Sequence, residues 1–161
     1  MKHKDFGAVL KAARLAKGLS TRAVNVLTGI SYSSISLYEN KHVDPSFLYM
    51  VLLCDVYDVE LNDMANTVRP ASHHRDRHTK SISDRHIKRD TTLGEVFKTG
   101  RERSRLSTRA VEALTGVSCV SVTRYETNES MPSFTPAVRM CDLYGIYIDD
   151  LANLLRHHSI T

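Results

Sequence analysis

The stretch LSTRAVNVLTGIS at residues 19–31 returns almost unchanged at residues 106–118, as LSTRAVEALTGVS. Tyr38-Glu39 follows the first copy, and Tyr125-Glu126 follows the second at the same offset of 87 residues. Aligning residues 6–66 with 93–153 needs no gap and gives 27 identities in 61 positions. Self-similarity of this length predicts two tandem copies of one domain.

The repeat divides the 161 residues into two modules, at 1–66 and 92–158, with a linker at 67–91. Modules of about 60 residues are small but viable as independent domains. The segment between them contains Pro70, many Arg, His, Ser and Asp residues, and few large aliphatic residues. Such a segment cannot bury enough surface to order itself, so we expect a flexible basic linker.

The net charge of +4 is unevenly distributed. Both modules are close to neutral, whereas residues 67–91 carry seven basic and three acidic residues. Within the first module, seven basic and two acidic residues lie before position 43, and five acidic and no basic residues lie at 44–63. One end of this module is therefore expected to be positive, as in a domain that docks one face on phosphates.

The first helix is indicated by apolar periodicity. Phe6, Val9, Leu10 and Ala13 recur at the i, i+3, i+4, i+7 spacing of one helix face. Gly18 then stands where a C-cap glycine ends a helix.

Two further helices follow with a short turn between them. Ser20 is placed to cap a helix through residue 28, Gly29 supplies a sharp turn, and Ser31 caps the next helix. The spacing of the caps predicts a helix-turn-helix arrangement. The side chains expected to point inward are Val24, Leu27, Ile35 and Tyr38.

The rest of each copy is also predicted to be helical, which makes the fold class all-α. Ser46 precedes a strongly apolar fourth helix, and a short fifth helix runs through residues 61–65. In the second copy, Thr92 and Glu95 match a capping box. Its helices are expected at about 93–104, 107–115, 118–126, 133–144 and 148–156.

No cofactor or metal site is predicted. Cys54 and Cys141 are repeat equivalents on an apolar helix and are expected to be buried thiols. For Cys119 an inert thiol is favoured over a redox sensor. A polar linker cannot supply the fixed geometry that a metal needs, so we expect solvated side chains at His73, His74, His78 and His86.

Several classes of function are excluded by the motifs that are missing. The sequence has no Gly-rich phosphate loop and no nucleophile with an ordered His partner, so we expect no enzyme. No apolar run approaches the roughly 18–20 residues that span a bilayer, and residues 1–6 lack the apolar stretch of a signal peptide. We therefore expect a cytoplasmic protein without a membrane partner.

The pattern resembles the Cro/C1 (XRE) helix-turn-helix family of phage and bacterial repressors, and it does so twice. The resemblance implies two tandem five-helix domains of the lambda-repressor type. The matching residues of the first copy are Arg14, Ser20, Thr21, Val24, Gly29, Ile30, Ser31, Ile35, Glu39, Pro45, Ser46, Cys54, Asp55, Val56 and Tyr57. Those of the second copy are Arg101, Ser107, Thr108, Val111, Gly116, Val117, Ser118, Val122, Glu126, Pro132, Ser133, Cys141, Asp142, Leu143 and Tyr144.

The family fold implies an ion pair between Arg14 and Glu39, which would tie the first helix to the end of the third. In the second copy it implies the same pair between Arg101 and Glu126.

One position departs from the family pattern. Where the family favours Ala in the second helix, this chain has Asn25 and Glu112. Either the second and third helices are splayed, or these side chains tilt outward.

The resemblance also implies which residues contact DNA. In the family, the start of the second helix binds phosphate and the exposed face of the third enters the major groove. The phosphate contacts would be Thr21, Arg22, Thr108 and Arg109, helped by Asn40, Lys41, Thr127 and Asn128 in the loops after the third helices. Base contacts would come from Ser31, Tyr32, Ser33, Ser36, Leu37, Ser118, Cys119, Val120, Ser121, Thr123 and Arg124.

Only Arg124 belongs to the residue class that reads guanine through two hydrogen bonds. For Tyr32 and Leu37, simple surface exposure stays open as an alternative. Since the two predicted reading helices differ in sequence, we expect the modules to read different half-sites of double-stranded DNA.

The favoured function is a sequence-specific transcription regulator, a repressor of the phage or mobile-element type. The alternative is an inhibitor, antitoxin-like or anti-defence protein that uses the same fold to bind a protein partner. Formation of a homodimer stays open in both cases.

Overall fold

The computed structural model of the protein describes residues 5–41, 43–70 and 91–158, which form ten α-helices. The chain divides into two compact units, residues 1–75 and 76–161. We call their described parts the N-terminal module (5–70) and the C-terminal module (91–158). The prediction of an all-α protein with two tandem five-helix modules is confirmed.

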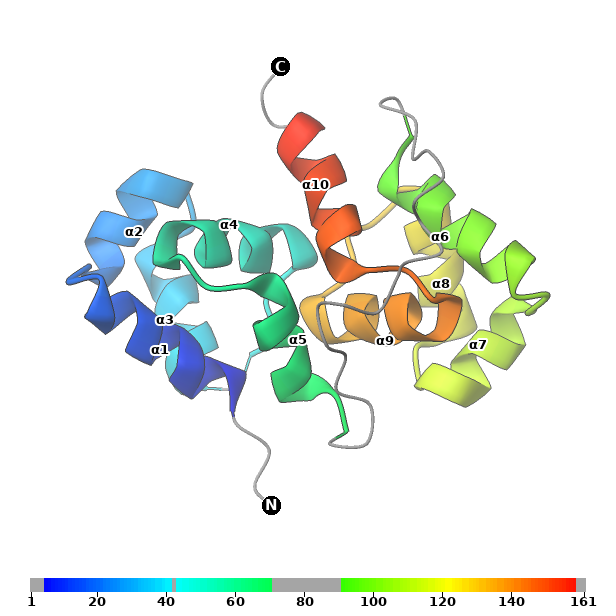
Figure 1. The fold of residues 1–161 in the computed structure, drawn as a ribbon, viewed down its shortest axis with the longest axis horizontal. Helices are drawn as coiled ribbons and strands as arrows, with labels where there is room; N and C mark the ends of the chain where they lie inside the picture. The colour runs from blue at the N-terminus through cyan, green and yellow to red at the C-terminus, as the bar shows by residue number, and fades with distance from the viewer. Residues whose placement is uncertain (1–4, 42, 71–90, 159–161) are drawn as a thin grey trace. The chain divides into compact units, whose positions relative to one another are not determined.

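In the N-terminal module, α1 packs against α3, α4 and α5, while α2 packs against α3 and α4 (Figure 1). Apolar α4 therefore packs against both α1 and α2. The bounds are α1 Phe6–Ala16, α2 Thr21–Thr28, α3 Tyr32–Asn40, α4 Phe47–Tyr57 and α5 Leu61–Val68.

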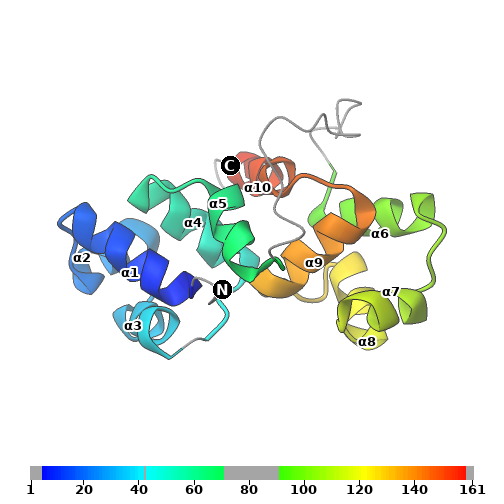
Figure 2. The same cartoon turned by 60° about the horizontal axis from the view of Figure 1, so that its bottom comes forward.

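The C-terminal module repeats this packing: α6 contacts α8, α9 and α10, and α7 contacts α8 and α9 (Figure 2). The bounds are α6 Leu93–Arg103, α7 Thr108–Thr115, α8 Cys119–Glu126, α9 Phe134–Tyr144 and α10 Ile148–His158.

Hydroxyl side chains begin the helices where the sequence predicts. Ser20 Oγ and Ser31 Oγ each accept the N–H of the third residue of the helix that follows, at 3.1 Å. Thr92 and Glu95 form the predicted capping box, and the hydrogen bonds from Thr92 lower the pKa of the Glu95 carboxyl. Ser107 and Ser118 cap α7 and α8 in the same way, so local capping fixes the starts of the helix-turn-helix pair in both copies.

The core holds most of the predicted apolar residues, but the prediction for Leu27 is wrong. Val24, Ile35 and Tyr38 are buried, whereas Leu27 is 61% exposed and its repeat equivalent Leu114 is 63% exposed. Because α2 has only eight residues, its rotation is set by Val24 against the core, and that rotation turns Leu27 to solvent. The predicted buried thiols, Cys54 and Cys141, are confirmed.

The N-terminal module extends beyond its predicted boundary at residue 66. Helix α5 continues to Val68, and the side chain of Arg69 is buried. Its guanidinium donates to Asn62 Oδ1 at 2.7 Å and to Asn66 Oδ1 at 2.9 Å, which offsets the cost of burying the charge. Residues 71–90 of the predicted linker, including its four histidines, lie outside the described residues.

A glycine near the start of each module's first helix allows close contact with the end of its third helix. A Cβ atom on Gly7 would lie 2.6 Å from Tyr38 O. A Cβ atom on Gly94 would lie 2.6 Å from both Tyr125 O and Glu126 O. No other residue type fits at this separation, so the two glycines set how closely α1 meets α3 and α6 meets α8.

Two equivalent tyrosines bury a hydroxyl that has no hydrogen-bond partner among the described residues: Tyr57 on α4 and Tyr144 on α9. Burial raises the pKa of each hydroxyl above its usual value, and the nearby carboxylate of Glu39 or Glu126 adds to the effect. An unpartnered buried hydroxyl costs about 1–3 kcal/mol of desolvation.

Replacing Gly94 with Ala is expected to lower the free energy of unfolding of the C-terminal module by about 1–3 kcal/mol, because the new methyl group overlaps two carbonyl oxygens. Hydrogen exchange of α8 amides in the full-length protein measures this loss. Thr99→Ala, at an exposed position of the same helix, is the control and should leave the exchange unchanged. Equal exchange in both variants would contradict the close contact.

Tyr57→Phe is expected to raise the free energy of unfolding of the N-terminal module by about 1 kcal/mol, because it removes a buried, unpartnered hydroxyl. The measurement is hydrogen exchange of α4 amides. The matched control is Tyr49→Phe, where the side chain is exposed and no gain is expected. A loss of stability in Tyr57→Phe would mean that the hydroxyl is hydrogen-bonded.

Candidate nucleic-acid interface

A three-residue turn joins α2 to α3, and an equivalent turn joins α7 to α8. Gly29 and Gly116 adopt left-handed φ values of 75° and 74°, a conformation that costs glycine little. Thr28 Oγ1 donates to Val24 O and accepts from Ile30 N–H, so the turn is tied to the helix before it. These bonds hold the two helices at one fixed angle.

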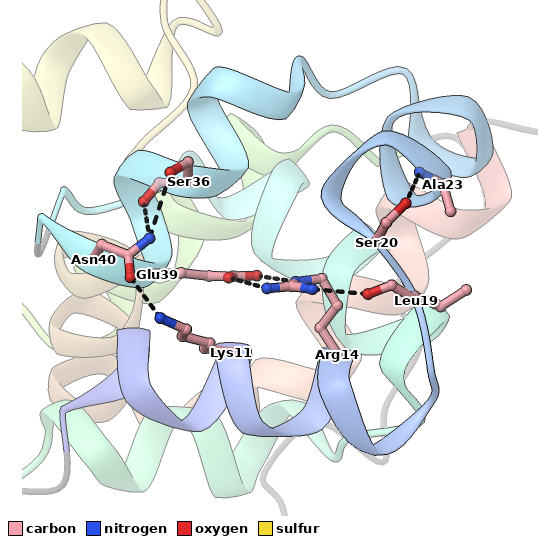
Figure 3. A network of polar contacts seen from close by, with 8 residues as sticks. All are labelled: Lys11, Arg14, Leu19, Ser20, Ala23, Ser36, Glu39 and Asn40. Atoms are coloured by element: carbon pink, nitrogen blue, oxygen red, sulfur yellow. Dashed lines mark hydrogen bonds and ion pairs between the residues drawn. The ribbon is translucent and has the colours of Figure 1, made fainter.

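The implied ion pair between Arg14 and Glu39 is present and buried (Figure 3). Arg14 Nε and Nη2 donate to the two carboxylate oxygens at 2.7 and 2.8 Å, and Nη1 donates to Leu19 O at 2.7 Å. The hydrogen bonds with Glu39 raise the pKa of the guanidinium, against the effect of burial. One side chain thus links α1, the approach to α2 and the end of α3.

The C-terminal module contains the same pair. Arg101 donates to the two Glu126 oxygens at 2.7 and 2.9 Å and to Leu106 O at 3.0 Å. The hydrogen bonds with Glu126 raise the pKa of Arg101 as well. The third helix of each module is therefore held by a bidentate contact at its C-terminal end.

The outward face of α3 carries no charge before its end. Tyr32 is 56% exposed and Leu37 is 45% exposed, with Ser33 and Ser36 between them also exposed. The Ser31 hydroxyl is within hydrogen-bond distance of the hydroxyls of Ser33 and Ser34. Large apolar surface and small hydroxyls make up this face.

The outward face of α8 is different. Val120 is 58% exposed, and Arg124 is exposed, with no hydrogen bond or ion pair from its guanidinium to the other described residues. The Thr123 hydroxyl donates to Cys119 O, and the Ser118 hydroxyl donates to Ser121 Oγ. Arg124 is thus the cation that this helix presents outward.

A second cation lies at the start of each preceding helix. Arg22 in the first turn of α2 and Arg109 in the first turn of α7 are exposed and make no ion pair within the described parts of the chain. Thr21 and Thr108 beside them are partly buried. Each module therefore has an exposed guanidinium at the N-terminus of its second helix, beside the outward face of its third helix.

Two family models match the chain. One, described as a helix-turn-helix, matches residues 10–64, and the other, described as a helix-turn-helix domain, matches residues 92–155. The chain is a tandem helix-turn-helix protein of the Cro/C1 (XRE) type. Comparison with curated proteins and with solved structures gave no match.

Membership of this family makes the tandem helix-turn-helix protein a DNA-binding regulator. No helix in the described ranges is long and apolar enough to cross a membrane. The same ranges contain no cluster of three or more side chains suited to holding a metal ion.

Three residues expected in the phosphate-binding loops have their side chains engaged inside the tandem helix-turn-helix modules. Asn40 accepts from Lys11 Nζ at 2.9 Å and donates to Ser36 O (Figure 3). Asn128 Oδ1 accepts from the N–H of Gly94 at 2.9 Å, and its Nδ2 donates to the Thr92 hydroxyl.

Thr127 is the third of these residues, and its hydroxyl donates to the carbonyl of Thr123 on the preceding helical turn. In the N-terminal module, Lys41 is exposed, and its ammonium group makes no hydrogen bond or ion pair to other described residues.

The two residues that depart from the family pattern each make a hydrogen bond with the backbone of the turn or of the helix after it, Asn25 partly buried and Glu112 exposed. Asn25 Nδ2 donates to Ile30 O at 2.9 Å, inside the turn. Glu112 Oε2 accepts from the N–H of Cys119, the first residue of α8, at 3.2 Å. The sequence predicted no role in the site for these two residues. Their departure from the Ala that the family favours was the signal that could have identified them.

Glu126→Ala is expected to destabilise the C-terminal module by about 3–5 kcal/mol, because it leaves the Arg101 charge buried without its partner. A loss of that size approaches the whole stability of a small domain, so α6–α10 should lose protection in hydrogen exchange. The control is Glu102→Ala, which removes an exposed carboxylate 3.9 Å from the same guanidinium. A melting temperature equal to wild type in Glu126→Ala would refute the structural role.

Proposed function

We propose that the protein is a sequence-specific transcription regulator, a repressor of the phage or mobile-element type, in which each module reads one half-site. The observation that carries the proposal is that two nearly identical helix-turn-helix frames present unlike outward faces on α3 and α8. The shared frame supports a shared docking mode, and the unlike faces support different sequences. Repression is favoured because it requires only occupancy of the DNA.

Contacts to the phosphate backbone are assigned to the starts of α2 and α7. Arg22 and Arg109 extend from the first turn of these helices, where backbone N–H groups also point outward. Lys41 adds a cation after α3. Such contacts fix the register and orientation of each module on the duplex without reading its sequence.

Base recognition is assigned to α3 and α8. The unpaired guanidinium of Arg124 suits the N7 and O6 acceptors of guanine, a contact worth about 1–3 kcal/mol of discrimination. In the N-terminal module, Leu37 and Tyr32 offer apolar surface that suits thymine methyl groups. The two half-sites therefore differ in base composition.

The length of chain between the modules permits both to bind together. Residues 71–90 can span up to about 70 Å when fully extended. Neighbouring major-groove faces are about 34 Å apart. Once one module is bound, the second contact becomes intramolecular, so one chain can replace a dimer of single-module repressors.

A protein-binding function is the second candidate, and it is favoured by exposed apolar residues in the N-terminal module. Val26 is 83% exposed, and Leu15 and Leu27 are 59% and 61% exposed. In the C-terminal module the first two positions hold Ala113 and Glu102. The larger number of exposed apolar side chains on the first two helices of the N-terminal module fits an inhibitor or antitoxin-like protein that binds a protein partner.

Selection from a random DNA library with purified full-length protein tests the leading proposal. The expected result is a two-part site with centres about one helical turn apart. In Arg124→Ala one half should lose its guanine preference, while in Leu37→Ala, the equivalent position of the other module, only the other half should change. Loss of both halves in either variant would contradict independent reading.

The salt dependence of binding separates the two candidate functions. DNA binding through several phosphates should weaken steeply between about 50 and 200 mM salt. Arg109→Ala should reduce the slope of the logarithm of the binding constant against the logarithm of the salt concentration by about one. Absence of any enriched sequence at moderate salt, from protein shown to be folded, would favour the protein-binding function.

A further inference from the structure

The two modules differ at the point where the reading helix begins. Asn25 is partly buried, and its amide bonds to the carbonyl of Ile30 within the turn, one residue before the helix cap. The equivalent residue, Glu112, is exposed, and its carboxylate reaches past the turn to the N–H of Cys119. The C-terminal module therefore places a negative charge beside the first residue of α8, where the N-terminal module has none.

The bond to Cys119 holds the Glu112 carboxylate in place and leaves it able to accept more hydrogen bonds. One oxygen, Oε2, accepts the Cys119 N–H at 3.2 Å. A carboxylate has about four lone-pair sites, so further acceptor capacity remains. The positive end of the α8 dipole stabilises a negative charge at this place.

Docking of helix-turn-helix proteins of this kind sets the N-terminal residues of the reading helix against base edges in the major groove. The Glu112 carboxylate lies at that end of α8. The carboxylate would repel a phosphate oxygen at this place. Its partner on the DNA must therefore be a hydrogen-bond donor on a base. In the major groove, the amino groups of cytosine and adenine are those donors.

Cytosine suits a carboxylate better than adenine does. Adenine presents the N7 acceptor beside its N6 amino group, and N7 repels a carboxylate oxygen. Cytosine presents its N4 amino group without an acceptor of its own beside it.

We propose that Glu112 is a specificity-determining residue of the C-terminal module, which accepts a hydrogen bond from the N4 amino group of a cytosine. The inference rests on the proposed function of the same site. Arg124 lies five residues after Cys119, about 7.5 Å along the helix axis, which corresponds to roughly two base-pair steps. The half-site of this module then contains a cytosine read by Glu112 and, about two steps away, a guanine read by Arg124.

The first test is library selection with Glu112→Gln beside wild type, with Glu102→Gln as the control at an exposed carboxylate on α6. Gln keeps an oxygen that can accept the Cys119 N–H, so the module should stay folded. Glu112→Gln should lose the preference for cytosine at one position by roughly tenfold or more, with the guanine preference of Arg124 unchanged. Glu102→Gln should select the wild-type site.

The second test changes the DNA, so that it does not depend on the stability of a variant. The cytosine of the selected site is replaced by a pyrimidin-2-one nucleotide, which lacks the 4-amino group. Wild type should lose about tenfold in affinity, and Glu112→Gln should lose much less, since the interaction is already absent.

Three results would overturn the inference. An unchanged cytosine preference in Glu112→Gln means that the carboxylate only caps α8. A uniform gain in affinity for all sequences means that it only repels phosphate. An equal effect of pyrimidin-2-one on both proteins means that the amino group is read by another residue. Failure of the proposed function itself differs from all three, because wild type would then enrich no sequence.

Discussion

A buried bidentate contact between an arginine and a glutamate fixes the position of the third helix in each module. Arg14, on α1, uses three donors to bond two further segments: two go to Glu39 at the end of α3, and one goes to the carbonyl of Leu19 just before the cap of α2. This charge can be buried only because all of its hydrogen-bond partners are present. Arg101 repeats the arrangement on α6, so the same constraint sets both outward faces.

Other residues of each module position the helices that this ion pair joins. Gly7 and Gly94 allow the first helix to pack against the backbone carbonyls at the end of the third helix, next to the glutamate of the ion pair. The left-handed glycine of the turn and the serine caps set the start of the third helix, while the ion pair sets its end. Because the turn, the serine cap and the ion pair fix the two ends of this helix, the outward positions between them are free to differ between the copies.

Sequence reasoning was reliable where the controlling interactions are local or recur in both copies. Caps, the turn glycine and the capping box act within a few residues, and the family resemblance, found in both copies, implied the arginine–glutamate pair. Leu27 was misplaced because α2 is too short for periodicity to fix its rotation. Asn128 was assigned to phosphate contact, but its amide accepts from Gly94, 34 positions earlier, a contact that depends on tertiary placement. The role of Arg69 was missed because this residue was assigned to the linker, although its bonds to Asn62 and Asn66 are local.

The unequal starts of α3 and α8 have a consequence for symmetry. A repressor made of two identical chains reads a palindrome, so it has no front or back on the duplex. Under the proposed function, a single chain with a neutral Asn25 turn in one module and a charged Glu112 turn in the other would not read a palindrome equally with both. Its two unlike modules would give the bound chain a direction along the DNA, which can point toward one neighbouring gene and away from the other.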